Sequence, residues 1–123
     1  MESSPGPVAS TMSQLDKALA LSRAGGDEEL LRELAALFLD DYPRNLEELK
    51  TAIAAGVAAD IEHHAHSLKG SVSNFGAPEV VAAALALEQQ GRNHTLEETP
   101  AALRRLESAL AALKPELESL LVG

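Results

Sequence analysis

The sequence predicts an all-α fold, an antiparallel up-down four-helix bundle with a short additional N-terminal helix. Leu and Ala are abundant, whereas aromatic residues make up only 2% of the 123 residues, and this balance favours helix over β-sheet. Apolar residues recur at spacings of three and four along most of the chain, which is the period of one helix face. The turns expected at Gly56 and Gly76 are short, and short connections make successive helices antiparallel neighbours.

The N-terminal part divides into a lead and the start of one domain. Residues 1–12 are small, polar and rich in proline, and we expect a disordered lead or linker there. Residues 13–122 are long enough for a single helical bundle domain with its own core. Ser13 is expected to cap a short helix of about ten residues, which ends before Gly25. Its inward side chains should be Leu15, Ala18 and Leu19.

A long helix is expected over 27–55, with Asp27 as its cap. Pro43 lies inside it, and a proline in a helix interior removes one backbone hydrogen bond at a cost of about 3 kcal/mol or more. The apolar stripe nevertheless continues past Pro43 without a change of phase, whereas a break would reset it. We therefore predict one long, kinked helix that Gly56 closes. The inward stripe comprises Leu31, Leu34, Phe38, Tyr42, Leu46, Leu49 and Ile53.

A second long helix is expected over 57–74, with Gly76 as a left-handed stop. Pro78 suits the first turn of a third helix, which is expected to end near Gly91. This third helix is rich in Ala, whose small side chains let a neighbouring helix approach closely. Its predicted inward stripe is Val81, Ala84, Leu85 and Glu88.

The last helix should follow a loop over 92–97. Thr99 is expected to cap it, with Pro100 at its first position, although Thr95 and Glu98 offer a competing capping box. The inward stripe of this helix is purely leucine: Leu103, Leu106, Leu110, Leu113, Leu117 and Leu120.

Composition excludes several classes of function. The chain has no Cys, hence no disulfide framework and no thiolate chemistry. Its net charge of −9 argues against a nucleic-acid partner. No apolar run approaches the roughly 20 residues of a membrane span, and the N-terminus lacks a signal-peptide pattern. We expect a cytoplasmic protein that binds neither nucleic acid nor membrane.

The most informative stretch is 60–76, which holds three of the four histidines. On a helix, His66 points roughly 160° away from the middle of the apolar stripe. Lys69 follows it at i+3 and Gly70 at i+4, so the three residues share one outward face. The apolar stripe on the opposite face comprises Ile61, Ala65, Leu68, Val72 and Phe75.

This face suits phosphoryl chemistry. A neutral imidazole nitrogen is a nucleophile that can carry a covalent group near neutral pH. A phosphoryl group brings about two negative charges and needs a nearby cation, which Lys69 supplies. Gly70 leaves the adjacent turn bare, so the group and a partner can approach. An exposed His with a Lys at i+3 is also typical of an ordinary solvated face, so spacing alone leaves both interpretations open.

Residues 66–71 read His-Ser-Leu-Lys-Gly-Ser and resemble the H-x-x-K-G-S signature of histidine-containing phosphotransfer (HPt) domains. The resemblance extends over about 13–121, nearly the whole expected domain. Further positions that fit the family pattern are Gly26, Asp27, Leu30, Leu31, Phe38, Ala65, Asn74, Phe75, Gly76, Ala77, Leu87, Glu88 and Gly91.

The resemblance implies a phosphorelay carrier in two-component signal transduction. His66 would accept a phosphoryl group from the aspartate of one receiver domain and pass it to the aspartate of another. Lys69 would neutralise the phosphoryl charge, and Gly70 would give steric access. Family members often hydrogen-bond the histidine from a neighbouring helix, and the sequence does not identify that residue here.

The resemblance also implies partners and cofactors. Response-regulator receiver domains and a hybrid histidine kinase are the expected partners of a monomeric carrier. No P-loop or kinase-like nucleotide motif is present, so we expect a phosphocarrier rather than an enzyme that phosphorylates itself with ATP. No intrinsic cofactor is expected, and Mg²⁺ should come with the receiver.

Other interpretations remain open at this stage. The same face could belong to a non-catalytic docking bundle that binds receiver-like partners, or to the dimerisation segment of a histidine kinase. The intact signature argues against the first, and the lack of an ATP-binding domain against the second. The sequence also leaves open whether the carrier is free-standing or part of a larger hybrid kinase.

No metal site is expected. His64 and His66 are two residues apart and diverge on a helix, and neither Cys nor an obvious third ligand accompanies them. We expect His63 to flank the active face, and His64 and His94 to be ordinary polar residues.

Overall fold

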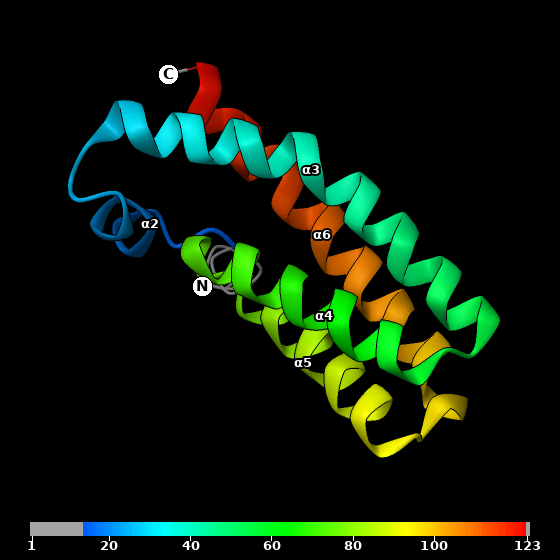
Figure 1. Cartoon of the computed structure of the whole chain (residues 1–123). Helices are drawn as coiled ribbons and strands as arrows, with labels where there is room; N and C mark the ends of the chain where they lie inside the picture. The colour runs from blue at the N-terminus through cyan, green and yellow to red at the C-terminus, as the bar shows by residue number, and fades with distance from the viewer. Residues whose placement is uncertain (1–13, 123) are drawn as a thin grey trace, which may run out of the picture.

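The computed structural model describes residues 14–122, whose regular structure is helical (Figure 1). Its helices are α2 (Lys17–Arg23), α3 (Glu28–Ala55), α4 (Ala58–Val72), α5 (Pro78–Asn93) and α6 (Thr99–Val122), with the short 3₁₀ helices η1 (Ser73–Phe75) and η2 (Leu96–Glu98). Over 14–122 there is no β-strand, only an isolated antiparallel bridge between Leu15 and Gly76. The predicted all-α class is confirmed. The predicted lead over 1–12 lies outside the described residues.

The four long helices form a closed bundle. α3 packs against α4, α4 against α5, α5 against α6, and α6 returns to α3. The chain reverses at each short connection, so helices that follow one another run antiparallel (Figure 1). This is the predicted up-down bundle. The short helix α2 lies at one end of the bundle, where it contacts η1 and α3.

The short helix α2 differs from its prediction. Asp16 caps it, with Oδ1 accepting a hydrogen bond from the backbone N–H of Leu19 at 3.0 Å. The predicted cap, Ser13, lies outside the described residues. The helix starts later than predicted because the preceding backbone pairs elsewhere: the Asp16 N–H donates to the carbonyl of Phe75. Consequently Ala18, predicted to face inward, is exposed, and Ala20 is buried instead.

α3 runs unbroken through Pro43, as the phase of the apolar stripe predicted. Pro43 is exposed, so the missing hydrogen bond falls on the solvent side, where water can satisfy the carbonyl of Leu39. The cap is the predicted one, because the Asp27 carboxylate accepts from the N–H groups of Glu29 and Leu30 at 3.0 and 3.1 Å. The kink at Pro43 stays a prediction.

α4 ends at Val72, slightly earlier than predicted, and η1 extends the helical path to Phe75. Gly76 then ends it with a φ of 83° and a ψ of −88°. The predicted glycine stop with a positive φ is confirmed, but its conformation is not the left-handed helical one. A side chain at this position would also collide with α2's cap, because a Cβ on Gly76 would lie 2.7 Å from the Cβ of Asp16.

The predicted loop over 92–97 is wrong. α5 continues past Gly91 to Asn93, His94 ends it with a left-handed φ of 59°, and η2 begins at Leu96. Gly91 does not end the helix. It lies within α5, where the absence of a side chain lets α4 pack closely against it. The connection is therefore shorter than the composition of residues 92–97 suggested.

The predicted stripe of α5 is shifted. Leu85 is 38% exposed and Val81 is only partly buried, whereas Ala84 and Glu88 are buried as predicted. The shift arises because α5 packs against both α4 and α6, so its buried face is broad and centred between these neighbours. That face comprises Val80, Ala83, Ala84, Leu87, Glu88 and Gly91.

The start of α6 differs from the prediction in the hydrogen bond that Thr99 makes. Thr99 is buried, and its hydroxyl donates to the carbonyl of Leu96 at 2.7 Å rather than accepting from the first turn of the helix. The alternative cap, Thr95, makes no side-chain capping bond. The leucine stripe is confirmed: its centre is buried, and Leu103 and Leu120 at its ends are partly exposed. None of the helices within 14–122 combines the length and apolarity needed to cross a bilayer.

Candidate functional site

His66 lies in the middle of α4, on the face that points away from the core. Ile61, Ala65, Leu68 and Val72 on the opposite face are fully buried. The helical rotation that buries them leaves the His66 side chain 66% exposed. This is the orientation that the spacing predicted.

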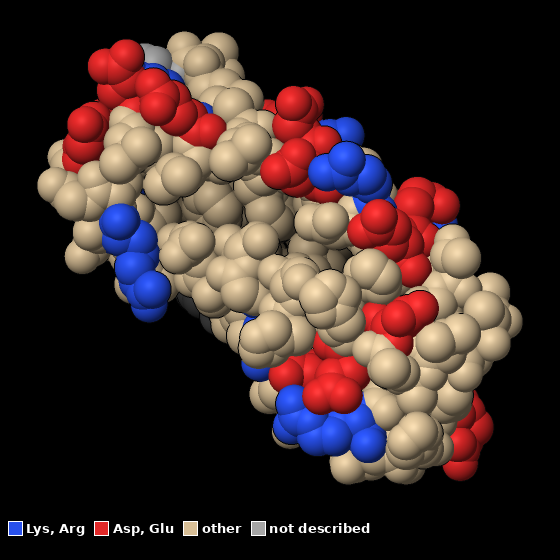
Figure 2. Space-filling model, in the orientation of Figure 1, with Lys and Arg blue, Asp and Glu red and all other residues tan. Residues whose placement is uncertain are grey.

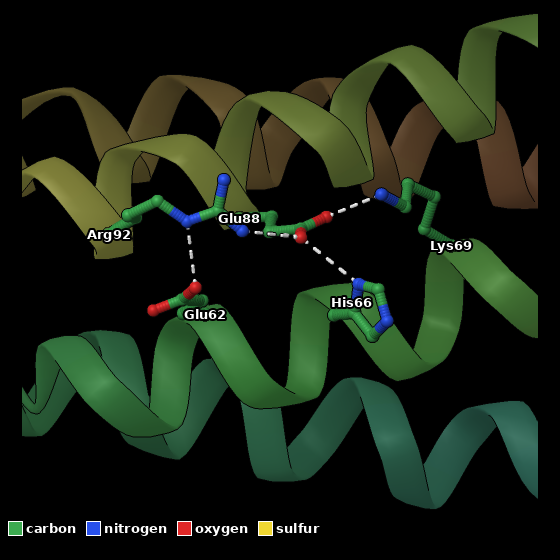
Figure 3. Close-up of polar contacts among 5 residues, drawn as sticks. All are labelled: Glu62, His66, Lys69, Glu88 and Arg92. Carbon is green, nitrogen blue, oxygen red and sulfur yellow. Dashed lines mark hydrogen bonds and ion pairs between the residues drawn. The ribbon is translucent and has the colours of Figure 1, made fainter.

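Glu88, from the neighbouring helix α5, holds one nitrogen of the ring. Its Oε2 is 3.0 Å from Nδ1 of His66. The contacting carboxylate accepts hydrogen bonds but does not donate them when ionised, so Nδ1 must carry the proton in this contact. The neutral ring then has its free lone pair on Nε2, which points away from Glu88 (Figure 3). The Glu88 side chain is only 6% exposed, so its position is fixed by packing.

Two cations contact the same carboxylate (Figure 3). The ammonium of Lys69 lies 2.7 Å from Oε1 of Glu88. Arg92 donates from Nη2 to Oε2 of Glu88 at 3.0 Å, and from Nε to Glu62 of α4 at 2.9 Å. The site is therefore a buried carboxylate surrounded by an imidazole, an ammonium and a guanidinium group.

The electrostatics of the site keep this carboxylate ionised. Burial by itself would raise the pKa of Glu88, but the contacts with Lys69 and His66 outweigh burial and hold the pKa below its ordinary value of 4.5. Glu88 is therefore an anion at neutral pH, able to accept from Nδ1.

Two glycines have opposite surroundings. A Cβ added to Gly70 would meet nothing within 4 Å, so the space above the turn after His66 is open. A Cβ added to Gly91 would lie 2.8 Å from both the carbonyl oxygen of Ala58 and the backbone nitrogen of Glu62. Gly91 thus lets α5 approach the backbone of α4, which brings Glu88 within reach of His66.

The other histidines make no contact with this carboxylate, although His63 lines the same hollow as His66 and so flanks the site as predicted. His63 and His64 are in edge-to-face contact with each other, with ring centroids 5.2 Å apart. His64 faces α3, where its Nδ1 is 3.8 Å from Glu48, and His94 ends α5. Among residues 14–122 no three side chains of the metal-binding types come together in a way that could hold an ion.

Glu88 and Arg92 are the site residues that sequence reasoning missed. Glu88 was predicted to lie on the inward stripe of its helix, which is correct, but without a role. The sequence did indicate a role for Glu88, because an acidic residue on a buried stripe needs a cationic partner. Arg92 gave a weaker signal, at i+4 from Glu88, where a pair of opposite charges meets on a helix.

We expect Glu88→Gln to lower the free energy of unfolding by about 1–2 kcal/mol at neutral pH, because it neutralises a buried acceptor of charged hydrogen bonds. The pKa of Glu88 is depressed in the folded state, so its contribution is present above its ordinary pKa and is lost as pH falls through the folded value. Urea unfolding of the wild type and of Glu88→Gln from pH 7 to pH 3 should therefore show a difference in unfolding free energy that narrows below about pH 4.5. Glu97→Gln, at an exposed carboxylate, should follow the wild type, and a gap for Glu88→Gln that stays constant to pH 3 would contradict the assignment.

The fold and this cluster together define a class of protein: a helical bundle that carries a phosphoryl group on histidine. The family model for the Hpt domain matches residues 33–116, more than half of the chain. The chain belongs to the Hpt domain family, whose members are histidine-containing phosphotransfer carriers in phosphorelay signalling.

A solved structure agrees with this assignment. The crystal structure of histidine-containing phosphotransfer protein B (HptB) from Pseudomonas aeruginosa PAO1 superimposes with a TM-score of 0.80, at 29% sequence identity. The match covers 86% of this chain and 92% of that chain. A comparison with curated protein sequences gives no match.

Proposed function

We propose that His66 is the phosphoryl-carrying residue and that Nε2 is the atom that carries the group. One observation supports this above the others: the His66 ring is exposed while its Nδ1 is held by a buried carboxylate on another helix. A surface histidine without a role needs no such partner. The contact orients the ring and leaves the nucleophilic lone pair facing solvent.

The transfer step needs no general base, because the attacking nitrogen of His66 carries no proton. The lone pair on Nε2 of His66 attacks the phosphorus of an aspartyl phosphate on a receiver domain. The P–O bond to the aspartate breaks, and its electron pair leaves with the aspartate carboxylate. Nδ1 keeps its proton, so the phosphorylated ring is a cation, which the Glu88 carboxylate stabilises across 3.0 Å. The reverse step passes the phosphoryl group to a second receiver.

Lys69 and Gly70 have separate roles in this step: Lys69 supplies charge and Gly70 leaves space. Lys69, one turn from His66, brings the positive charge that offsets the phosphoryl oxygens. Gly70 leaves the space beside the ring open, as its surroundings indicate. Figure 2 shows acidic side chains along α3 with basic ones among them, a second group of acidic and basic side chains at the lower end of the same face, and a largely uncharged area between the two. A negatively charged phosphoryl group is repelled less over the uncharged area, so the partner should approach over that area.

The partners proposed are receiver domains and a hybrid histidine kinase, with the carrier acting as a cytoplasmic monomer that does not use ATP. Among residues 14–122 no carboxylate cluster of the metal-binding kind adjoins His66. We therefore propose that the Mg²⁺ of the transfer step comes with the receiver.

The test is direct labelling. The carrier is mixed with a phosphorylated receiver domain, quenched, and digested for peptide mapping of the label. The expected result is an acid-labile, base-stable phosphoryl group on the peptide that contains His66. Receiver binding without any label would select the docking-bundle function instead, and label on His63 or His64 would move the site.

Gly70→Leu is expected to slow phosphoryl transfer by roughly tenfold or more while leaving the fold intact. The new side chain would occupy open space beside His66, where, apart from the adjoining residues and backbone of α4 itself, no atom lies within 4 Å of the added Cβ. The unfolding free energy should rise slightly, since Leu is a better helix former than Gly by about 0.8 kcal/mol. Stopped-flow or quench-flow transfer rates and urea unfolding measure both effects. An unchanged transfer rate would show that this space is not used by the partner.

A further inference from the structure

In the unphosphorylated protein Lys69 is paired with Glu88. During transfer it has to pair with the phosphoryl group instead. Its ammonium lies 2.7 Å from Oε1 of Glu88, and its side chain is 26% exposed. Oε1 itself is sealed from solvent. If Lys69 turned toward a phosphoryl group on His66, this buried oxygen would lose its counter-ion. A buried charge that loses its partner is strongly destabilised. The phosphorylated ring of His66 is a cation but also carries the anionic phosphoryl group, so the carboxylate needs a second cation.

Arg92 is placed to be that cation. It donates to Oε2 of Glu88, whereas Lys69 contacts Oε1, so one cation can leave without displacing the other. Its Nε donates at the same time to Glu62 on α4, which anchors the guanidinium across the two helices. The guanidinium group is always protonated and has five donors in a rigid fork, so it can bind one or both oxygens of a carboxylate.

We propose that Arg92 is a positioning residue, which keeps Glu88 negatively charged and seated at Nδ1 of His66 while Lys69 exchanges Glu88 for the phosphoryl group. The proposal rests on the proposed role of His66 as the phosphoryl carrier. Arg92 lies outside the 66–71 signature and acts through Glu88 rather than on the phosphoryl oxygens. The Lys69–Glu88 contact is accordingly the resting arrangement of the site, and the Arg92–Glu88 contact is the one that persists.

The first test is the rate of transfer. Arg92→Gln is expected to lower the rate from a phosphorylated receiver to His66 by roughly tenfold, because Glu88 is no longer held when Lys69 leaves. Arg92→Lys keeps the charge but loses the fork, so it should recover part of the rate. Arg105→Gln, which removes the same charge from an exposed position of α6, should transfer like the wild type. Circular dichroism and urea unfolding establish that each variant is folded.

A double-mutant cycle separates this role from a direct one. In a Glu88→Gln background there is no carboxylate charge for Arg92 to hold. The rate effect of Arg92→Gln should then shrink to less than about threefold, although Glu88→Gln is itself slow. If the two losses multiply instead, Arg92 contacts the phosphoryl group independently, and the proposal is wrong.

A spectroscopic readout follows the carboxylate itself. The ¹³C shift of the Glu88 carboxyl, titrated with and without phosphorylation, should report an ionised group in both states of the wild type. In Arg92→Gln its pKa should rise on phosphorylation, since Lys69 has left and the one cation still beside Glu88, the His66 ring, now carries the anionic phosphoryl group. An unchanged pKa together with an unchanged rate would overturn the role of Arg92. Failure of the wild type to take label on His66 would instead remove the proposed function, so the two failures are distinguishable.

Discussion

His66→Gln is expected to reduce labelling by a phosphorylated receiver by more than about 10³-fold, to background. The amide nitrogen that replaces the ring nitrogen has no nucleophilic lone pair. The fold should be unaffected, because the His66 side chain is 66% exposed and the new amide can still donate to Glu88. Quench-flow transfer rates measure the loss, and urea unfolding measures stability. The loss can then be assigned to chemistry rather than to unfolding.

His94→Asn is the matched control. It removes an exposed imidazole at the C-terminal end of α5, outside the carboxylate cluster, and should change the transfer rate by less than about twofold. Binding of the receiver to His66→Gln should persist. Labelling of His66→Gln at the wild-type rate would mean that another residue carries the group, and a loss in His94→Asn equal to that in His66→Gln would show that the assay reports something other than the site.

The elements of this fold were largely predictable from periodicity. The phase of the stripe on either side of Pro43 identified α3 as one helix, and Asp27 and Gly76 marked ends that the structure confirms. The errors occur where local signals compete with packing. Asp16, rather than Ser13, caps α2 because residues before it pair with the end of η1. Gly91 resembled a helix end, but the close approach of α4 requires a glycine within the helix.

Only the site residues that lie on α4 were predictable from the sequence. One helix face places His66, Lys69 and Gly70 together, because their spacing is fixed by the helix itself. The contact between His66 and Glu88 depends instead on how α5 is rotated and how closely it approaches α4, which spacing within one helix does not determine. Arg92 and Glu62 are likewise brought together by packing of the two helices. Periodicity identified the inward position of Glu88 but not its partner.

Gly91→Ala is expected to lower the free energy of unfolding by about 2–3 kcal/mol, because it overpacks the contact between α4 and α5. The added Cβ would lie 2.8 Å from the carbonyl oxygen of Ala58 and 2.8 Å from the backbone nitrogen of Glu62. Both are backbone atoms within α4, so the clash cannot be relieved by rotating a side chain. The gain in helix propensity, at most about 1 kcal/mol, is too small to offset it. Urea unfolding at neutral pH measures the change.

The same substitution should also slow transfer, since α4 and α5 must separate to admit the methyl group. His66 is on α4 and Glu88 is on α5, so separation lengthens their 3.0 Å contact and loosens the ring. A ¹⁵N spectrum of the His66 ring should show the two neutral tautomers mixing, whereas the wild type should show one. Gly70→Ala is the control: the identical change on α4, with open space around the new Cβ, should slightly stabilise the bundle and leave the tautomer unchanged. If Gly91→Ala were as stable as Gly70→Ala, the distance between the two helices would not be set by this glycine.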